Sequence, residues 1–236
     1  MPPSGCSLPP LFAELDLWND QTPRPGDVQM AIDETLLLGG LTRPLLRHYL
    51  WLGDWASFGY SQSLAAARSE APGLQLVRRW TGGGVVRHDA DWTFSLLIPV
   101  QDAFCKLRPR DSYLAIHERI ASVLTACRDA PDMRLAGTGD CQKALSCFAG
   151  PTLYDVMDVA GGKICGGAQR RTRAGVLHQG SIQNSRGQLP KTFGEDLGGQ
   201  LAGNVREYGP PHFLGAHSEH LAQAHYGHPG WTERIP

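Results

Sequence analysis

Apolar residues recur with a helical period in two segments of the chain. Residues 27–38 show this pattern after Asp27, a residue suited to the N-cap, and the segment ends at Gly39 and Gly40. In residues 111–128 the apolar positions follow the 3.6-residue period; they are Tyr113, Ile116, Ile120, Val123, Leu124 and Cys127. The pattern predicts a helix in each segment. From Pro190 onwards we expect a mostly helical region with Pro and Gly breaks.

Shorter apolar runs, several of them alternating with polar positions, predict strands. Single strands are expected at residues 44–53, 74–80, 92–100 and 175–184, and Pro99 is expected to end the third. Residues 152–169 are expected to form two strands joined by a hairpin turn at Gly161 and Gly162. Residues 56–62 are interpreted as a loop. Residues 1–25 carry six prolines and are interpreted as an irregular lead-in with one short strand near residues 12–18.

Clustered strands, hairpins and flanking helices together predict an α+β fold. We expect a mixed, largely antiparallel sheet flanked by helices. A chain of this length forms one large domain or two small ones, and we expect residues 26–236 to form a single domain.

Composition and charge narrow the class of protein. Apolar residues make up 42% of the 236 residues, enough for a sizeable core, and 22 basic against 23 acidic residues give a net charge of −1. Nucleic-acid binding is not expected because the basic excess typical of such proteins is absent. No membrane association is expected, since no run of about 18 apolar residues is present. The N-terminus lacks the pattern of a signal peptide, which predicts a cytoplasmic protein.

The six cysteines show no metal-binding or disulfide pattern. None stands in a Cys-x-x-Cys pair, so no cysteine pair precedes the histidines as in a zinc finger. In an intracellular chain most of them are expected to be small buried hydrophobic residues. No metal site is expected.

A glycine-rich stretch, RRWTGGGVVRHD (residues 78–89), stands between two predicted strands. Three consecutive glycines allow the backbone to approach a ligand closely and to adopt positive φ angles. Dinucleotide-binding and phosphate-binding loops both need a helix directly after the glycines, and no helix is predicted here. The stretch is either a glycine-rich hairpin turn or a wall of a binding pocket, and the neighbouring Arg79, His88 and Asp89 favour the pocket.

Two further residues are candidates for chemistry. Lys163 follows the predicted hairpin turn in GGKICGGAQRR (residues 161–171), and its ammonium is either a solvated surface group or a ligand for a carbonyl or phosphate oxygen. Such an ammonium would also lower the pKa of a nearby thiol. Cys147 stands in a predicted loop before a strand, outside the periodic core positions, so it is either a small hydrophobic residue or a candidate nucleophile.

In this order, the segments resemble the catalytic domain of the biotin/lipoate ligase family, which has a class II synthetase-like fold. The resemblance covers nearly the whole chain. It is carried by MAIDETLL (residues 30–37), LRHYLWLGDWASFGYSQ (46–62), RRWTGGGVVRHD (78–89), GGKICGGAQRR (161–171) and LHQGSIQ (177–183). Within the family, the chain is most similar to lipoate–protein ligase A and the related octanoyltransferases.

The resemblance implies a role for each segment. The glycine loop would wrap the acyl chain or an acyl-adenylate, and Lys163 would contact the acyl carbonyl region. Gln179 departs from the family because it stands where a histidine is usual, and an amide cannot act as acid or base near neutral pH. Its neighbour His178 would face the other side of the strand. The binding positions implied are Arg79, Gly82, Gly83, Gly84, His88, Asp140, Gly166, Gly167, Ala168, His178, Gln179 and Gly180.

The family contains two reaction types. A ligase activates free lipoate with ATP and Mg, forms lipoyl-AMP and passes the acyl group to a lysine of a lipoyl domain. An octanoyltransferase needs neither and takes octanoate from acyl carrier protein through a cysteine thioester. The segment SCFAGPTLYDV (residues 146–156) favours the transferase, because Cys147, Phe148, Pro151 and Tyr154 match its pattern. GTGDCQ (residues 137–142) retains only Asp140 of the ligase pattern.

We therefore expect an acyltransferase of protein lipoylation in which Cys147 is acylated. Cys165, two residues from Lys163, is the second candidate nucleophile. No accessory C-terminal domain, of the ~100 residues typical of a domain, is expected. The donor would be acyl carrier protein, and the acceptors would be lipoyl-domain proteins: the glycine cleavage H protein and the E2 subunits of 2-oxoacid dehydrogenases.

Two alternatives remain open from the sequence. One is an ATP-dependent lipoate–protein ligase. The other, of a different class, is a non-catalytic acyl-binding relative in which Gln179 marks the decay of the site. A biotin ligase is not indicated, since the sequence lacks its glycine- and arginine-rich adenylate loop.

Overall fold

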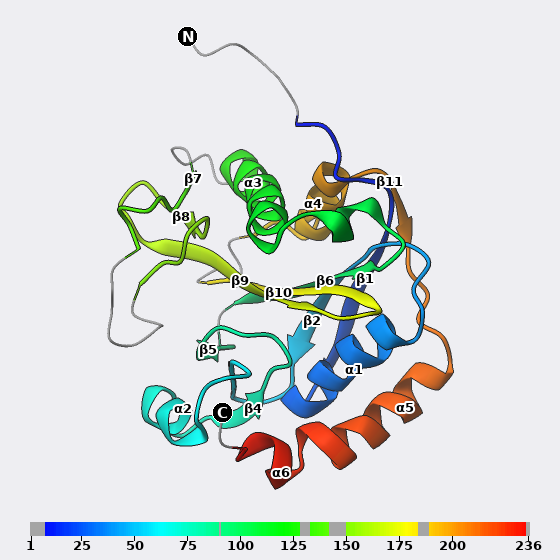
Figure 1. The fold of residues 1–236 in the computed structure, drawn as a ribbon, viewed down its shortest axis with the longest axis vertical. Coiled ribbons are helices and arrows are strands. Elements are labelled where there is room, and N and C mark those ends of the chain that lie inside the picture. Colours follow the sequence, from blue (N-terminus) through cyan, green and yellow to red (C-terminus); the bar gives the residue numbers. More distant parts are fainter. Residues whose placement is uncertain (1–7, 90, 128–132, 142–149, 184–188, 235–236) are drawn as a thin grey trace.

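The computed structural model describes residues 8–89, 91–127, 133–141, 150–183 and 189–234 (Figure 1). Two sheets form its centre. In spatial order, the larger sheet contains β11 (Ala202–Glu207), β1 (Phe12–Arg24), β2 (Leu45–Trp51), β6 (Trp92–Pro99), β10 (Gly175–Ile182), β9 (Lys163–Arg171), β8 (Val156–Met157) and β7 (Arg134–Leu135). The smaller sheet contains β4 (Gln75–Arg78), β3 (Trp55–Phe58) and β5 (Val86–Arg87).

The larger sheet is mixed and largely antiparallel, as predicted. Its β11–β1 and β1–β2 pairs are parallel. The other five pairs that the described residues form are antiparallel. Of the antiparallel pairs, β8–β9 and β9–β10 are joined by short hairpin turns, whereas the parallel pair β1–β2 is joined by a crossover that contains a helix.

Helices cover both faces of the larger sheet (Figure 1). Helices α3 (Pro109–Cys127) and α4 (Phe193–Leu201) lie on one face, and α1 (Gly26–Leu38) and α5 (Phe213–Leu221) lie on the other. One hydrophobic core lies on each face of the larger sheet, and side chains of β6 point alternately into the two. Phe94 and Leu96 pack with α3 and α4, whereas Leu97 packs with α1 and α5. Among the described residues, no helix is both long and apolar enough to cross a membrane.

The two helices predicted from periodicity are confirmed as α1 and α3, but the predicted N-cap is wrong. Helix α1 begins at Gly26, so Pro25 occupies the N-cap position. Asp27 lies inside the first turn, where its carboxylate accepts a hydrogen bond from the Val28 amide at 2.9 Å. A carboxylate in this turn still interacts favourably with the positive end of the helix.

The N-terminal segment departs from the predicted irregular lead-in. Residues 12–24 form the 13-residue strand β1, which pairs with β2 on one side and with β11 on the other. Pro23 is tolerated because it lies where the register shifts between Asp20 and Arg24, so its missing N–H interrupts no regular ladder. Residues 12–24 are therefore an integral part of the larger sheet.

Several short elements were also not predicted. Strand β3 occupies part of the expected loop at residues 56–62, and β11 lies within the region expected to be helical. Helix α2 (Leu64–Glu70) has Ser63 as its N-cap, whose side chain accepts a hydrogen bond from the Ala66 amide at 3.2 Å. The hairpin predicted at Gly161 and Gly162 is confirmed, and Gly161 has a φ of 87°.

The C-terminal segment is attached to the strand that precedes the glycine loop. It contains the π-helical turn η2 (Ala222–Tyr226) and α6 (Pro229–Thr232). The buried Arg78 guanidinium in β4 donates five hydrogen bonds of 2.5–2.9 Å, to the carbonyl oxygens of Tyr60, Gln62, Trp231, Thr232 and Arg234. A guanidinium has five N–H donors, so Arg78 is fully used in holding these segments together.

Candidate active site

The predicted lysine lies beside a buried carboxylate. Lys163 is the first residue of β9, and its ammonium contacts Asp155 Oδ2 at 2.8 Å. The Lys163 side chain is 40% exposed, whereas Asp155 is fully buried. Asp155 also accepts hydrogen bonds from the Tyr113 hydroxyl at 2.5 Å and from the Thr152 amide and hydroxyl at 2.7 and 2.9 Å. The fixed carboxylate orients the ammonium and leaves its other N–H groups accessible to a ligand.

Two glycines of β9, Gly166 and Gly167, leave space for the side chains of Lys163 and His178. A Cβ atom at Gly166 would lie 2.5 Å from Lys163 Cε and 2.6 Å from Lys163 Nζ. A Cβ atom at Gly167 would lie 2.6 Å from Nε2 of His178. The small residues around Lys163 therefore allow its side chain to lie across the strand beside Asp155.

The glycine loop lies on the same face of β9 as the ammonium of Lys163. A Cβ atom at Gly83 would lie 3.7 Å from Cβ of Ala168. Residues two apart in a strand, such as Gly166 and Ala168, point to the same side. Gly83 has a φ of 86°, which strains any residue with a side chain, and a Cβ at Gly59 would lie 1.7 Å from the Gly83 carbonyl oxygen. Backbone atoms thus make the close contacts of this loop.

Arg79 shapes the loop from inside the protein. Its buried guanidinium donates to the carbonyl oxygens of Gly82 and Gly84 at 3.0 and 2.8 Å, and to Ser57 Oγ at 2.8 Å. Burial lowers the pKa of Arg79 to about 10, so the group stays charged near neutral pH. The loop runs from β4 to β5 with no helix after the glycines, as predicted.

His88 is buried behind the loop. Its Nε2 contacts Ser57 Oγ at 2.7 Å, its Nδ1 contacts Asp91 Oδ2 at 2.8 Å, and its ring stacks on Trp51 with centroids 3.8 Å apart. With Asp91 accepting a hydrogen bond from Nδ1, Nε2 is left to accept a hydrogen bond from the Ser57 hydroxyl. These contacts support Arg79 through Ser57, so His88 contributes to the position of the loop.

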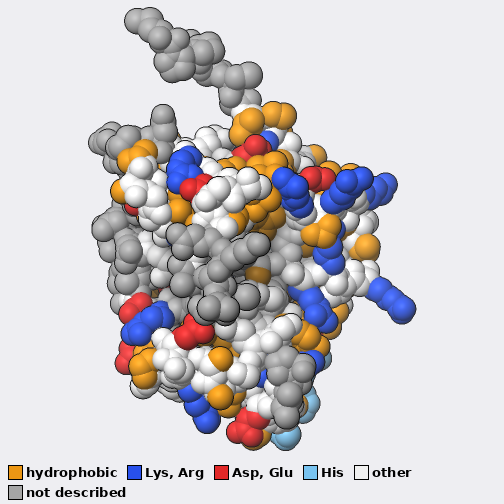
Figure 2. All heavy atoms as spheres, turned by 60° about the vertical axis from the view of Figure 1, so that its left-hand side comes forward, with side chains coloured by type: hydrophobic (Ala, Val, Ile, Leu, Met, Phe, Trp, Pro, Cys, Tyr) orange, Lys and Arg blue, Asp and Glu red, His pale blue; other side chains and the backbone are white. Residues whose placement is uncertain are grey.

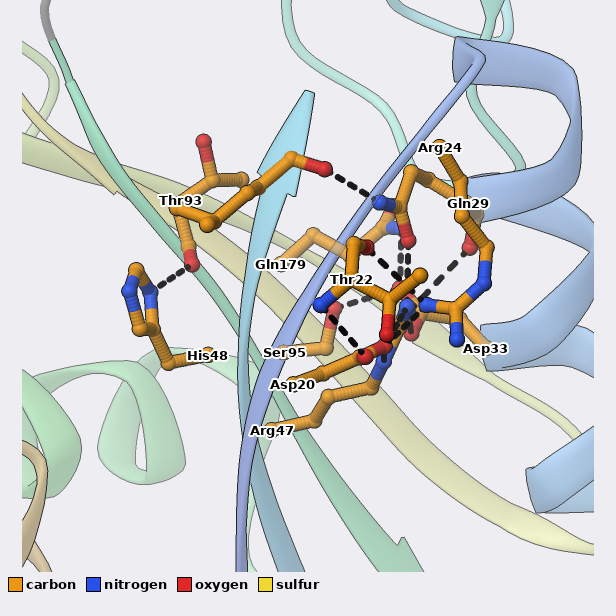
Figure 3. Close-up of polar contacts among 11 residues, drawn as sticks. Asp20, Thr22, Arg24, Gln29, Asp33, Arg47, His48, Thr93, Ser95 and Gln179 are labelled. Carbon is orange, nitrogen blue, oxygen red and sulfur yellow. Dashed lines mark hydrogen bonds and ion pairs between the residues drawn. The ribbon is translucent and has the colours of Figure 1, made fainter. Parts of the chain in front are cut away.

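Gln179 connects the loop to a buried ion pair. Its amide Nε2 donates to Asp33 Oδ2 at 2.8 Å, and its Oε1 accepts from the Thr81 hydroxyl at 2.7 Å. Arg47, which is fully buried, pairs with Asp33 at 2.8 Å. Figure 3 shows Gln179 and Arg47 approaching Asp33 from different strands. Gln179 therefore faces α1, on the same side of the sheet as the glycine loop.

His178 faces the other side of the sheet, as strand alternation predicts. Its ring centroid lies 5.5 Å from that of Tyr113 and 5.4 Å from that of His117. Nε2 of His178 and both ring nitrogens of His117 are buried without a hydrogen-bond partner among the described residues. Burial, and then the charge of Lys163, lowers the pKa of His117 to about 3, and burial lowers the pKa of His178 well below 6.5. Both rings are neutral at physiological pH.

Cys165 belongs to the hydrophobic core. It is fully buried in the core that α3 and α4 cover, and burial raises the pKa of its thiol. Val156 pairs with Cys165 and Met157 pairs with Lys163, which leaves one extra residue between them in β9. This bulge breaks the alternation on which the second candidate nucleophile was based.

Two other predicted positions, Asp140 and Gly180, lie elsewhere. Asp140 binds Arg134 through both carboxylate oxygens at 2.8 Å and accepts from the Gly137 amide, and the hydrogen bond from Arg134 is the main cause that lowers its pKa to about 2. Gly180 makes room for Phe94, whose ring would lie 2.3 Å from a Cβ at that position. Cys147 lies outside the described residues.

Residues 27–193 match the family model of the lipoyl protein ligase A/B catalytic domain. The chain belongs to this family. The octanoyltransferase LipM of Moorella thermoacetica is 34% identical to it over 162 residues, which are 65% of this chain and 59% of that protein. The matched region thus spans about three fifths of the curated relative.

Solved structures show the same fold as this member of the lipoyl protein ligase A/B family. The structure of a lipoate-protein ligase A bound with ATP superposes with a TM-score of 0.69 at 19% identity. The match covers 94% of this chain and 100% of that chain. A bipartite lipoate protein ligase of Thermoplasma acidophilum gives 0.67 at 18% identity, over 95% of this chain and 98% of that chain. The predicted fold is confirmed.

The sequence analysis did not identify Asp155 as the partner of Lys163. The residue stands directly before β8, the strand that pairs with the strand of Lys163. A carboxylate at that end of a hairpin is a recognisable partner for a lysine on the opposite strand. Asp33 and Thr81 carried no comparable signal, because their contacts with Gln179 depend on how α1 and the glycine loop pack on the sheet.

Proposed function

We propose that the protein is an acyltransferase of protein lipoylation. It moves an octanoyl group, or a lipoyl group, onto a lysine side chain of lipoyl-domain proteins. The observation that carries the proposal is the Lys163 ammonium, oriented by buried Asp155 and lying on the same face of β9 as the glycine loop. The similarity to an octanoyltransferase supports the choice of reaction.

The geometry suits an acyl chain with a polar head. The backbone at Gly82 and Gly83 provides a wall without side chains, and a Cβ at Gly82 would meet no atom within 4 Å. An ammonium at the end of this wall donates a hydrogen bond to the acyl carbonyl oxygen and stabilises the negative charge that develops there. Because Lys163 is paired with Asp155 at 2.8 Å, it acts mainly as a directed donor and less as a free positive charge.

The proposed reaction has two steps, with Cys147 as nucleophile. The Cys147 thiolate attacks the thioester carbon of the octanoyl donor, and the carrier thiolate leaves and takes up a proton. A neutral lysine amine of the acceptor then attacks the enzyme thioester, the amide bond forms, and the Cys147 thiolate leaves while the amine loses a proton to solvent. Thiolate is the reactive form in both steps.

The proposed partners are proteins on both sides of the reaction. Acyl carrier protein is the proposed donor, and the H protein and E2 subunits are the proposed acceptors. Exposed basic residues occur around the start of α3, at Lys106 in η1 (Ala103–Lys106), Arg108 and Arg110. Figure 2 shows Lys and Arg side chains gathered towards one edge of the face it displays. Such an edge favours encounter with an acidic protein.

The test is direct acylation without ATP. The protein is incubated with octanoyl-acyl carrier protein, and its intact mass is measured before and after addition of a lipoyl-domain acceptor. An octanoyl adduct is expected that disappears as the acceptor gains the same mass. Cys147→Ser should abolish the adduct, whereas the matched control Cys141→Ser should retain it. Modification of the acceptor that requires ATP and free lipoate would instead identify a ligase, and acyl binding without any transfer would identify a non-catalytic relative.

A further inference from the structure

We infer, on the basis of the proposed acyl transfer, that Gln179 is a positioning residue that sets the glycine loop for acyl binding. It does so through a buried relay from Arg47 and Asp33 to Thr81. We call this set of four residues, Arg47, Asp33, Gln179 and Thr81, the loop relay.

The polarity of the relay is determined by its charged end. A carboxylate accepts hydrogen bonds only, so the Gln179 amide presents Nε2 to Asp33 at 2.8 Å. Its Oε1 then faces Thr81, and the hydroxyl donates to it at 2.7 Å. Asp33, Gln179 and Thr81 are all buried, with exposures of 0%, 6% and 0%. No water competes strongly for these bonds at such burial, so each one is strengthened by the low local dielectric.

The charged end of the relay, Arg47 and Asp33, is held by further ion pairs that also neutralise its charge (Figure 3). Arg47 binds Asp33 at 2.8 Å and Asp20 at 2.9 Å, and Arg24 binds Asp20 at 2.5 Å. Two guanidinium and two carboxylate groups give this cluster no net charge. Ser95 also donates to Asp33 Oδ2. Asp33 is therefore a fixed acceptor, and Gln179 has one favourable amide orientation.

The other end of the relay positions the loop above β9. Thr81 directly precedes Gly82, and its carbonyl accepts from the Tyr60 amide at 2.9 Å. Gln179 pairs in register with Ala168, the residue that Gly83 approaches. The contact between Thr81 and Gln179 thus fixes the loop over Ala168. Ala168 lies two residues after Gly166, the residue beside the Lys163 ammonium.

An amide performs this task independently of pH. A neutral imidazole at the same position could also donate to Asp33 and accept from Thr81. A protonated imidazole donates from both nitrogens, so it would present an N–H to Thr81 and lose the hydroxyl bond. Gln179 therefore keeps the loop in place across the pH range in which a histidine would titrate.

Binding of octanoic acid and steady-state transfer test the relay. Gln179→Leu and Thr81→Val should each weaken octanoic acid binding about tenfold, as expected for a buried hydrogen bond left unmade. KM for the octanoyl donor should rise by a similar factor, whereas kcat should change less than about twofold, since the relay does not touch the reacting atoms. The double variant should bind no more weakly than the weaker single variant. Gln101→Leu, an exposed glutamine, is the matched control.

Gln179→His separates positioning from simple packing. Relative to the wild type at each pH, it should bind octanoic acid normally at pH 8, where NMR should show the introduced imidazole neutral, and about tenfold more weakly at the lower pH at which NMR shows the imidazole protonated. A side chain that only fills space would give the same ratio at both pH values, and that result would overturn the inference.

Hydrogen exchange of the loop distinguishes this inference from the proposed function. Amides in residues 80–86 should exchange about tenfold faster in Gln179→Leu than in the wild type or in Gln101→Leu, while those of α3 exchange at the same rate. Unchanged exchange and unchanged octanoic acid binding would refute the relay even in an active transferase. Conversely, faster exchange and weaker binding with no acyl transfer by the wild type would support the relay and refute the reaction.

Discussion

Acid should destabilise this protein through the histidines buried next to Tyr113. The His117 ring is fully buried, stacks on Tyr113 with centroids 3.9 Å apart, and has no partner for either nitrogen among the described residues. Its pKa falls from 6.5 to about 3, first because of burial and then because of the charge of Lys163. At pH 5 the ring is therefore neutral in the folded protein and protonated in the unfolded chain.

The magnitude follows from this difference in proton binding. Between pH 6.5 and 3 the unfolded state binds more protons than the folded state, so stability falls as the pH falls. The contribution of His117 is fully present above pH 6.5, and it is lost progressively below that value. Between pH 7.5 and pH 5.0 the loss is about 2 kcal/mol from His117 alone. This is a large share of a typical total stability of about 5–15 kcal/mol.

Urea unfolding, followed by the fluorescence of the six tryptophans, measures the effect. His117→Phe keeps a ring on Tyr113 and removes two buried nitrogens that lack partners, so it should be neutral or stabilising at pH 7.5. Between pH 7.5 and 5.0 it should lose about 2 kcal/mol less stability than the wild type. The exposed-site control His220→Gln should behave as the wild type. Equal losses in the wild type and in His117→Phe would show that His117 is not held neutral by burial.

Three further predictions concern the site. Lys163→Ala should abolish transfer and lower the melting temperature, because buried Asp155 loses its counter-charge. Slower iodoacetamide labelling of Cys147 at neutral pH would show that the ammonium activates the thiol, and unchanged labelling would assign it to the acyl carbonyl. Asp155→Asn should lower kcat about a hundredfold in the transfer assay, because Lys163 loses its fixed partner, and a normal kcat would show that Asp155 does not position the ammonium. Gly83→Val should cost ~1–3 kcal/mol in thermal melting and abolish octanoic acid binding by calorimetry; normal binding would identify the loop as a structural turn.

Local patterns were sufficient for the elements whose signals are contained in neighbouring residues. Helix α3 was predictable because its apolar residues repeat every 3.6 positions, and the hairpin before Lys163 because Gly161 and Gly162 permit a tight turn. The ordered motifs, the glycine loop and the lysine segment above all, were sufficient for the family and its fold. They also indicated that Lys163 and the loop belong to one site, and the structure places both on the same face of β9.

Only the tertiary structure decided which side chains meet. Strand β1 could not be recognised as a long strand because its neighbours β2 and β11 come from distant parts of the chain. The bulge in β9 interrupts the alternation between Lys163 and Cys165, and no sequence period reveals a bulge. Gln179 looked like a lost histidine until its partners were known: Asp33 lies 146 positions away and Thr81 lies 98 positions away. A polar side chain acquires its role from the donors and acceptors that packing brings within about 3 Å, and packing is a property of the whole chain.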